Sequence, residues 1–191
     1  MTRTIRTLVL GGSRSGKSAY AERLAAESGK EVVYLATARA GDGEMAARIA
    51  HHRRQRPAEW RTIEEPLELA AAIEHWAAPQ RLILVDCLTL WLSNLMFSDG
   101  TDYPDVGAIE LPPLFHAERA RLLQTLAGDG GDGGDIVLVS NEVGMGIVPY
   151  GAISRSFADE AGRLNQAVAA ACDRAIFVAA GLPLYLKGGP C

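Results

Sequence analysis

Short apolar runs recur along the chain and predict β-strands that are buried on both faces. Leucine, isoleucine and valine dominate these runs, and polar or glycine-rich residues bound them. The predicted strands cover residues 7–10, 31–36, 82–85, 136–140 and 175–179. Continuous apolar strands, without alternating polar positions, are typical of parallel sheets that helices cover on both sides.

Between these strands, apolar residues return at the three- and four-residue spacing of amphipathic helices. The predicted helices cover residues 19–26, 43–56, 66–76, 88–97, 114–126 and 154–172. Pro66 is expected at a helix start, because proline is favoured in the first helical turn. The alternation predicts an α/β fold, with a mostly parallel sheet and helices on both faces, in a single domain over residues 1–191. Segments 98–113 and 128–135, rich in glycine, aspartate and proline, are expected to be surface loops.

Composition and charge narrow the class of protein. A net charge of −4 and an isoelectric point near 5.6 argue against a general nucleic-acid-binding protein. The sequence has neither an apolar run of membrane-spanning length nor a signal-peptide pattern, so we expect a cytoplasmic protein with no membrane span. Its three cysteines lack metal-ligand spacing and are expected to be reduced, with Cys87 filling the core.

Residues 11–18 carry the clearest motif. They have the sequence Gly11-Gly12-Ser13-Arg14-Ser15-Gly16-Lys17-Ser18. This sequence fits the motif G-x-x-x-x-G-K-[ST], and it lies between a predicted strand and a predicted helix. In such a loop, backbone N–H groups and the helix N-terminus face a phosphate. Lys17 is expected to reach the β- and γ-phosphates, and the Ser18 hydroxyl to hold Mg²⁺. The motif predicts a P-loop NTPase-type domain.

Ligands of open parallel sheets bind at the carboxyl ends of the strands, so the residues that follow each strand are candidates. Asp86 ends the strand over 82–85, where a Walker-B carboxylate would help to hold Mg²⁺; the alternative is an ordinary strand-terminating aspartate. Asn141 and Glu142 follow the strand over 136–140. Glu142 is either a base or metal-linked carboxylate, or a solvated side chain in a tight turn, and spacing alone does not separate the two.

A basic segment over residues 51–57 contains two adjacent histidines. Arg48, His52 and Arg56 are four residues apart and would line one helical face, an arrangement that suits a nucleotide polyphosphate. A neutral imidazole can also act as a nucleophile toward phosphorus. From these residues alone, a solvated basic helix end is the favoured interpretation.

Several segments together resemble one family. They are the P-loop with Ala21-Glu22, residues 34–38, 44–53, 56–57, 60–62, 86–89, 94–95, 141–149, 155–159 and 162–166, and the closing residues 181–183 and 186–187. In this order they are similar to the bifunctional adenosylcobinamide kinase/adenosylcobinamide-phosphate guanylyltransferases of cobalamin biosynthesis. The P-loop is generic, whereas the run Asn-Glu-Val-Gly-Met-Gly-Ile-Val-Pro at 141–149 and the helix with Asn165-Gln166 are specific.

The resemblance implies two reactions. ATP or GTP phosphorylates the hydroxyl of the aminopropanol arm of adenosylcobinamide. GTP then guanylylates a histidine, and the GMP passes to adenosylcobinamide phosphate to give adenosylcobinamide-GDP. The family's Arg-Ile-x-x-His-Arg pattern selects His52 as that histidine, with Lys17 and Asp86 as the other catalytic residues. The family's assembly is trimeric, which implies a homo-oligomer.

The nucleotide contacts that the resemblance implies fall on residues along much of the chain. They are Gly11, Gly12, Ser13, Arg14, Ser15, Gly16, Lys17, Ser18, Ala36, Thr37, Ala38, Arg53, Arg54, Gln55, Arg56, Glu64 and Asp86, with Ser18 and Asp86 as the Mg²⁺ ligands. Two alternatives remain. One is a P-loop kinase of another small metabolite, with a structural histidine helix; the other is a nucleotide-binding regulator without transfer activity, in which His52 belongs to a partner surface.

Overall fold

The computed structural model describes residues 4–39, 43, 57–128 and 133–189. Within these residues, seven strands form one sheet in the order β3-β2-β4-β5-β1-β6-β7. Their bounds are β1 Arg6–Gly11, β2 Glu31–Ala36, β3 Arg61–Glu64, β4 Arg81–Asp86, β5 Asp135–Asn141, β6 Arg174–Ala179 and β7 Leu182–Lys187. All neighbouring strands are parallel except β6 and β7, which form an antiparallel hairpin. The predicted mostly parallel sheet is confirmed.

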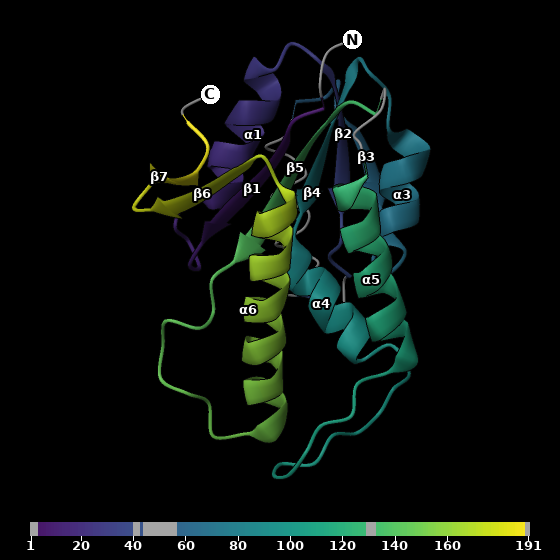
Figure 1. Ribbon diagram of the computed structural model, residues 1–191, viewed down its shortest axis with the longest axis vertical. Coiled ribbons are helices and arrows are strands. Elements are labelled where there is room, and N and C mark those ends of the chain that lie inside the picture. Colours follow the sequence, from purple (N-terminus) through teal and green to yellow (C-terminus); the bar gives the residue numbers. More distant parts are fainter. Residues whose placement is uncertain (1–3, 40–42, 44–56, 129–132, 190–191) are drawn as a thin grey trace.

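Helices cover both faces of the sheet, as predicted (Figure 1). Their bounds are α1 Lys17–Glu27, α3 Leu69–Trp76, α4 Leu88–Met96, α5 Pro113–Ala127 and α6 Ala152–Ala171. Residues of α1 pack with one apolar cluster of the sheet. Residues of α3, α4, α5 and α6 pack with a second cluster on the opposite face. The helix predicted over 43–56 lies, apart from Gly43, outside the described residues.

Two strands at the edges of the sheet were not predicted. β3 has the sequence Arg-Thr-Ile-Glu, which offers one large apolar residue and no apolar run. β7 alternates three exposed leucines with Pro183 and the half-buried Tyr185. Edge strands are buried on fewer sides, so they lack the apolar run that reveals the central strands.

Helix α3 begins at Leu69, three residues after the expected start at Pro66. The reason is a turn closed by Glu65, whose Oε1 accepts hydrogen bonds from the backbone N–H groups of Leu67 (2.9 Å) and Glu68 (2.8 Å). The other described helix bounds lie within about two residues of the predicted ones, as is usual for helix ends.

The carboxyl ends of the parallel strands β1, β2, β4 and β5 lie at one edge of the sheet. The long segment 142–151 leaves the end of β5 there, and the long segment 97–112 joins α4 to α5 (Figure 1). No described helix is long and apolar enough to span a bilayer.

Candidate active site

The P-loop has the geometry that its sequence predicts. It leaves β1 at Gly11, turns back through a Ser15 N–H to Gly12 carbonyl hydrogen bond of 3.2 Å, and enters α1 at Lys17. Gly16 has a φ of 93°, a left-handed conformation that favours glycine. A side chain at Gly11 would place its Cβ 2.5 Å from both Ser15 Oγ and Val178 O. This conformation of the loop therefore requires glycine at position 11.

The turn of the β6–β7 hairpin supports the P-loop from outside. Gly181 N–H donates to Ser15 O at 2.8 Å. A Cβ on Gly16 would lie 3.1 Å from the Cα of Gly181, so the two backbones are in close contact. The hairpin thus contacts the P-loop backbone at Ser15 and Gly16.

Lys17 is held inside the loop that it is expected to serve. Its side chain is 8% exposed, and its Nζ donates to Gly12 O at 3.2 Å. Burial lowers the pKa of the Lys17 amine, whereas Cys87 and Asp86 raise it. Asp86 is therefore close enough to interact electrostatically with Lys17, and a partly desolvated ammonium interacts strongly with phosphate.

Asp86 ends β4 on the α1 side of the sheet. Its Oδ2 accepts a hydrogen bond of 2.9 Å from the Tyr34 hydroxyl, and the carboxylate is half-buried. Ser18 lies half-buried in the first turn of α1. The structure thus places Asp86 beside the P-loop lysine. The Mg²⁺ roles of Ser18 and Asp86 stay predictions.

Thr37 is fully buried and joins the ends of β2 and β4. Its Oγ1 donates to Cys87 O at 2.7 Å and accepts from Cys87 N–H at 2.9 Å. Its N–H donates to Asp86 O at 3.3 Å, and its carbonyl accepts from Asn94 Nδ2 at 2.7 Å. The polar groups of Thr37 thus hold the strand that carries Asp86.

Cys87, next to Asp86, is buried as expected for a core residue. Burial raises the pKa of its thiol to about 11, with a further contribution from the Asp86 charge. The thiol is therefore protonated near neutral pH and is not a thiolate nucleophile.

The described nucleotide-site candidates gather at the carboxyl edge of the sheet. Glu64 ends β3 beside Ala36, its register partner on β2. Ala36 ends β2, Thr37 and Ala38 follow it, and the P-loop lies at the end of β1. His52, Arg53, Arg54, Gln55 and Arg56 lie outside the described residues. Their assignment to the site stays a prediction.

Comparison with known proteins identifies the family. The model of the cobinamide kinase/cobinamide phosphate guanyltransferase family matches residues 7–186. The chain belongs to this family. It is 55% identical over 186 residues to the bifunctional adenosylcobalamin biosynthesis protein CobP of Pseudomonas aeruginosa, covering 97% of this chain and 99% of that one. It is 41% identical over 180 residues to CobU of Escherichia coli, covering 94% and 98%.

Solved structures show the same fold at low identity. An ATPase of a bacterial type III secretion system aligns with a TM-score of 0.59 at 13% identity, over 96% of this chain and 57% of that one. The secretion ATPase EscN aligns with a TM-score of 0.55 at 14% identity, over 93% and 43%. These likenesses confirm the P-loop NTPase-type fold.

In this family member, a buried polar network lies beside the P-loop, and the sequence analysis did not identify it. Asn165 of α6 accepts at Oδ1 from the Ser140 hydroxyl (2.7 Å) and donates from Nδ2 to Asn141 O (3.1 Å). Thr89 of α4 accepts at Oγ1 from Asn141 N–H (2.7 Å) and lies 3.4 Å from Ser140 Oγ. Asn165 and Thr89 are 76 residues apart in sequence, so only the fold reveals this set.

Glu142 takes part in a tight turn, and its role as a base or metal-linked carboxylate stays a prediction. Its Oε1 accepts from Gly144 N–H at 2.6 Å, and its own N–H donates to Gly11 O at 3.1 Å. The carboxylate thus closes the turn after β5, and the backbone extends the pairing with β1 to the P-loop.

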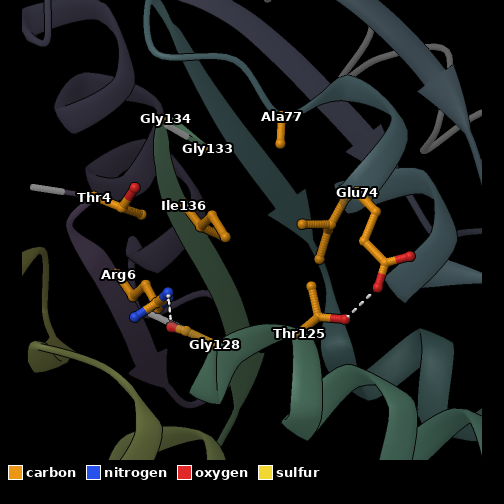
Figure 2. Close-up of a pocket in the computed structure, with 10 residues that line it drawn as sticks. Thr4, Arg6, Glu74, Ala77, Thr125, Gly128, Gly133, Gly134 and Ile136 are labelled. Carbon is orange, nitrogen blue, oxygen red and sulfur yellow. Dashed lines mark hydrogen bonds between the residues drawn. The ribbon is translucent and has the colours of Figure 1, made fainter. Parts of the chain in front are cut away.

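Figure 2 shows a cavity with its lining residues. Its lining includes the amino-terminal ends of β1 and β5, so it lies at the edge of the sheet opposite to the P-loop. It has a volume of about 270 Å³ and lies between the starts of β1 and β5 and the ends of α3 and α5. Arg6 and Glu74 line it, but they turn to local partners: Arg6 donates to Gly128 O, and Glu74 accepts from the Thr125 hydroxyl. The cavity is therefore separate from the nucleotide site.

Proposed function

We propose that this protein phosphorylates the aminopropanol hydroxyl of adenosylcobinamide with ATP or GTP, and then transfers GMP from GTP to the product through a guanylylated His52. The observation that carries the proposal is family membership over almost the whole chain, together with a formed P-loop whose lysine interacts with Asp86. The final product would be adenosylcobinamide-GDP.

The kinase step needs few protein groups. The acceptor hydroxyl oxygen bonds to the γ-phosphorus as the bond to the β–γ bridging oxygen breaks. The nucleoside diphosphate leaves, and the hydroxyl proton passes to water. Lys17 and the P-loop N–H groups orient the triphosphate and stabilise the charge on the transferring group.

The donor set around Lys17 fits Mg²⁺. The Ser18 hydroxyl and the Asp86 carboxylate are hard oxygen ligands on adjoining elements. The described residues contain no cluster of three or more histidine, cysteine or acidic side chains suited to a metal. That is compatible with an ion held by one carboxylate and the substrate phosphates. When bound, Mg²⁺ would neutralise charge on the phosphate oxygens.

The guanylyl step requires a separate nucleophile. A nitrogen of neutral His52 would bond to the α-phosphorus of GTP as the α–β bridging bond breaks and pyrophosphate leaves. A phosphate oxygen of adenosylcobinamide phosphate would then attack the same phosphorus and release the histidine. Arginines 53, 54 and 56 would pair with the phosphate oxygens during both transfers.

Intact mass spectrometry after incubation with GTP and Mg²⁺ tests the covalent route. We expect one added GMP, which acid releases and base preserves, and which disappears when adenosylcobinamide phosphate is added. The Lys17→Ala variant should lose both reactions by about 10²–10³-fold. Lys30→Ala is the matched control. Lys30 pairs with Asp135 at 2.7 Å at the amino-terminal ends of β2 and β5, which is the edge of the sheet opposite to the P-loop.

The outcomes separate the alternatives. Phosphorylation without GMP addition would favour a kinase with a structural histidine helix. Nucleotide binding without either product would favour a regulator.

A homo-oligomer is also part of the proposal. Leu182, Leu184 and Leu186 of the edge strand β7 are 71%, 60% and 58% exposed. Such a row of exposed apolar side chains supports coverage by a partner subunit. Light scattering across a concentration series measures the assembly, and a monomer at all concentrations would contradict it.

A further inference from the structure

The end of β5 places Asn141 between the two parts of the kinase site. β5 lies between β4, which carries Asp86, and β1, which leads into the P-loop. Asn141 is the register partner of Gly11, the first residue of the P-loop, and Val139 is the partner of Asp86. Neighbouring strands are about 4.8 Å apart, so the Asn141 backbone borders the loop directly.

The alternation of β5 places the Asn141 side chain on the reactive face. Val137 and Val139 belong to the apolar cluster that packs with α1, whereas Ser140 points to Asn165 on the other side. Successive side chains alternate between the faces of a strand, so Asn141 shares the face of Val139. Leu84 belongs to the same cluster as Val139, which places Asp86 on this face too.

The buried network described above fixes Asn141 from the opposite face. Thr89 holds its N–H and Asn165 holds its carbonyl. Ser140, Asn165 and Thr89 are 2%, 7% and 8% exposed. Buried polar side chains are destabilising unless they are paired, and a satisfied network specifies one local geometry. Here the network fixes the position of the Asn141 backbone. Among the described residues, no hydrogen bond to the Asn141 side-chain amide is present.

We propose that Asn141 donates a hydrogen bond from Nδ2 to the γ-phosphoryl group during the kinase step, with Thr89, Ser140 and Asn165 as positioning residues. The inference rests on the proposed function. An amide donor beside the γ-phosphate stabilises the charge on the transferring oxygens without being covalently changed. The guanylyl step breaks the α–β bond instead, so it depends less on this contact.

The first test compares Asn141→Ala with the wild type in both reactions. We expect the kinase kcat to fall about 10²–10³-fold, the usual effect of losing one such donor, with KM for ATP and GMP incorporation changed only slightly. Gln166→Ala is the matched control, since Gln166 is an exposed amide on α6 next to Asn165, and it should match the wild type. An unchanged kinase rate in Asn141→Ala, or an equal loss in both reactions, would overturn the assignment.

Two further variants define the role. Asn141→Asp keeps the size and removes the donor, so its kinase kcat should fall at least as far as in Asn141→Ala. A near-normal rate in Asn141→Asp would show that an acceptor is needed and would overturn the donor role. Ser140→Ala should lower the kinase kcat in the wild type but not in the Asn141→Ala background, because the network acts through Asn141. Additive losses would overturn the positioning role.

The wild type and the variants are checked for a cooperative thermal transition before the assays. If Asn141→Ala does not fold, the Asn141→Asp and Asn141→Gln pair decides the question: Asn141→Gln retains an amide donor and should be the more active. A wild-type protein that transfers no phosphate to adenosylcobinamide would overturn the proposed function itself, whereas an active wild type with an active Asn141→Ala variant would overturn only this inference.

Discussion

At the residue scale, a substitution at the end of β4 tests the proposed Mg²⁺ role of Asp86. We predict that Asp86→Asn raises the Mg²⁺ concentration needed for half-maximal kinase activity, because a neutral amide is a poorer ligand for a hard cation than a carboxylate. The substitution keeps the size and the oxygen that accepts from Tyr34, so the melting temperature should change little. A Mg²⁺ titration of the kinase rate, with a thermal melt, measures both.

Tyr34→Phe is the control for the Asp86 prediction. It removes the hydroxyl that donates to Asp86 but leaves the carboxylate charged. We expect a smaller rise in the Mg²⁺ requirement than in Asp86→Asn. If Asp86→Asn collapses the melting temperature while the metal dependence stays the same, Asp86 is a structural residue and the Walker-B assignment is wrong.

Single residues also show which parts of the site can be predicted from the sequence. The positions of the P-loop and of Asp86 were predictable, because their neighbours in sequence supply the strand, the turn and the helix that place them; their roles stay predictions. The hydrogen bonds of Asn94, Thr89 and Asn165 were not predictable, since each residue lies within a helix that was predicted from the spacing of its apolar residues. Their hydrogen bonds reach residues at least 24 positions away, and that proximity exists only after the sheet has formed.

At the scale of elements, the turn before β5 depends on one glycine. Gly134 has a φ of 73°, and a Cβ there would lie 2.1 Å from Ala78 O and 2.4 Å from Arg81 O. We predict that Gly134→Ala destabilises the fold by at least about 1–3 kcal/mol, the cost of a strained backbone conformation, with the backbone clash in addition. For a chain of this size, each kcal/mol lowers the melting temperature by about 2–4 °C.

Gly162→Ala provides the comparison for Gly134→Ala. Gly162 lies inside α6, and an added Cβ would meet no heavy atom within 4 Å other than those of its two neighbours and of the helix's own backbone. We expect the melting temperature to stay equal or rise, because alanine is the better helix former. Equal melting temperatures for the two variants would contradict the importance of the turn.

Helix α5 carries a buried carboxylate that makes stability depend on pH. Glu118 is 7% exposed, and within the described part of the chain its Oε2 has no hydrogen-bond partner. Burial raises the pKa of Glu118, and the charges of Glu65, Glu68 and Glu74 add to this, while Arg121 opposes it. The folded chain therefore holds this proton more tightly than the unfolded chain does.

The sign of the pH effect follows from that difference. An acid with a raised pKa in the folded state contributes most to stability below its unfolded pKa, near 4.5 for Glu118, and the contribution is lost as the pH rises through the folded pKa. We predict that Glu118→Gln melts at a higher temperature than the wild type at pH 7, and that the gap closes toward pH 4. Glu27→Gln, at an exposed site on α1, should show no such gap. A lower melting temperature for Glu118→Gln at pH 7 would contradict the prediction.

The strands that are buried along most of their length were predicted from the sequence, and the two partly exposed strands were missed. The central strands β1, β2, β4, β5 and β6 appear in the sequence as apolar runs. β3 and β7 lie at the edges, where exposure removes the pattern on which the prediction depends. Their pairing partners also come from the tertiary order of the sheet, which local periodicity does not encode.

At the scale of the whole molecule, the question is how one chain performs two phosphorus transfers. The P-loop, Asp86 and Asn141 lie at the ends of three adjacent strands, and we propose that they supply the groups for the kinase step. The proposed guanylyl step would add a nucleophile from the segment 51–57, and the resemblance implies that this segment belongs to the same nucleotide site. The two reactions should therefore be separable by substitutions in this segment.

We predict that His52→Ala abolishes GMP transfer and leaves phosphorylation of the cobinamide hydroxyl largely intact. The proposed kinase step uses the P-loop, Asp86 and the substrate's hydroxyl. The P-loop and Asp86 both lie outside the segment 51–57. His51 should not substitute for His52, because the sequence predicts a helix over 43–56, in which neighbouring residues would point about 100° apart. Separate assays of the two products, with His51→Ala in parallel, measure the outcome. If His51→Ala stops GMP transfer and His52→Ala does not, the register is wrong by one residue; if neither stops it, the basic segment binds nucleotide without forming a covalent intermediate.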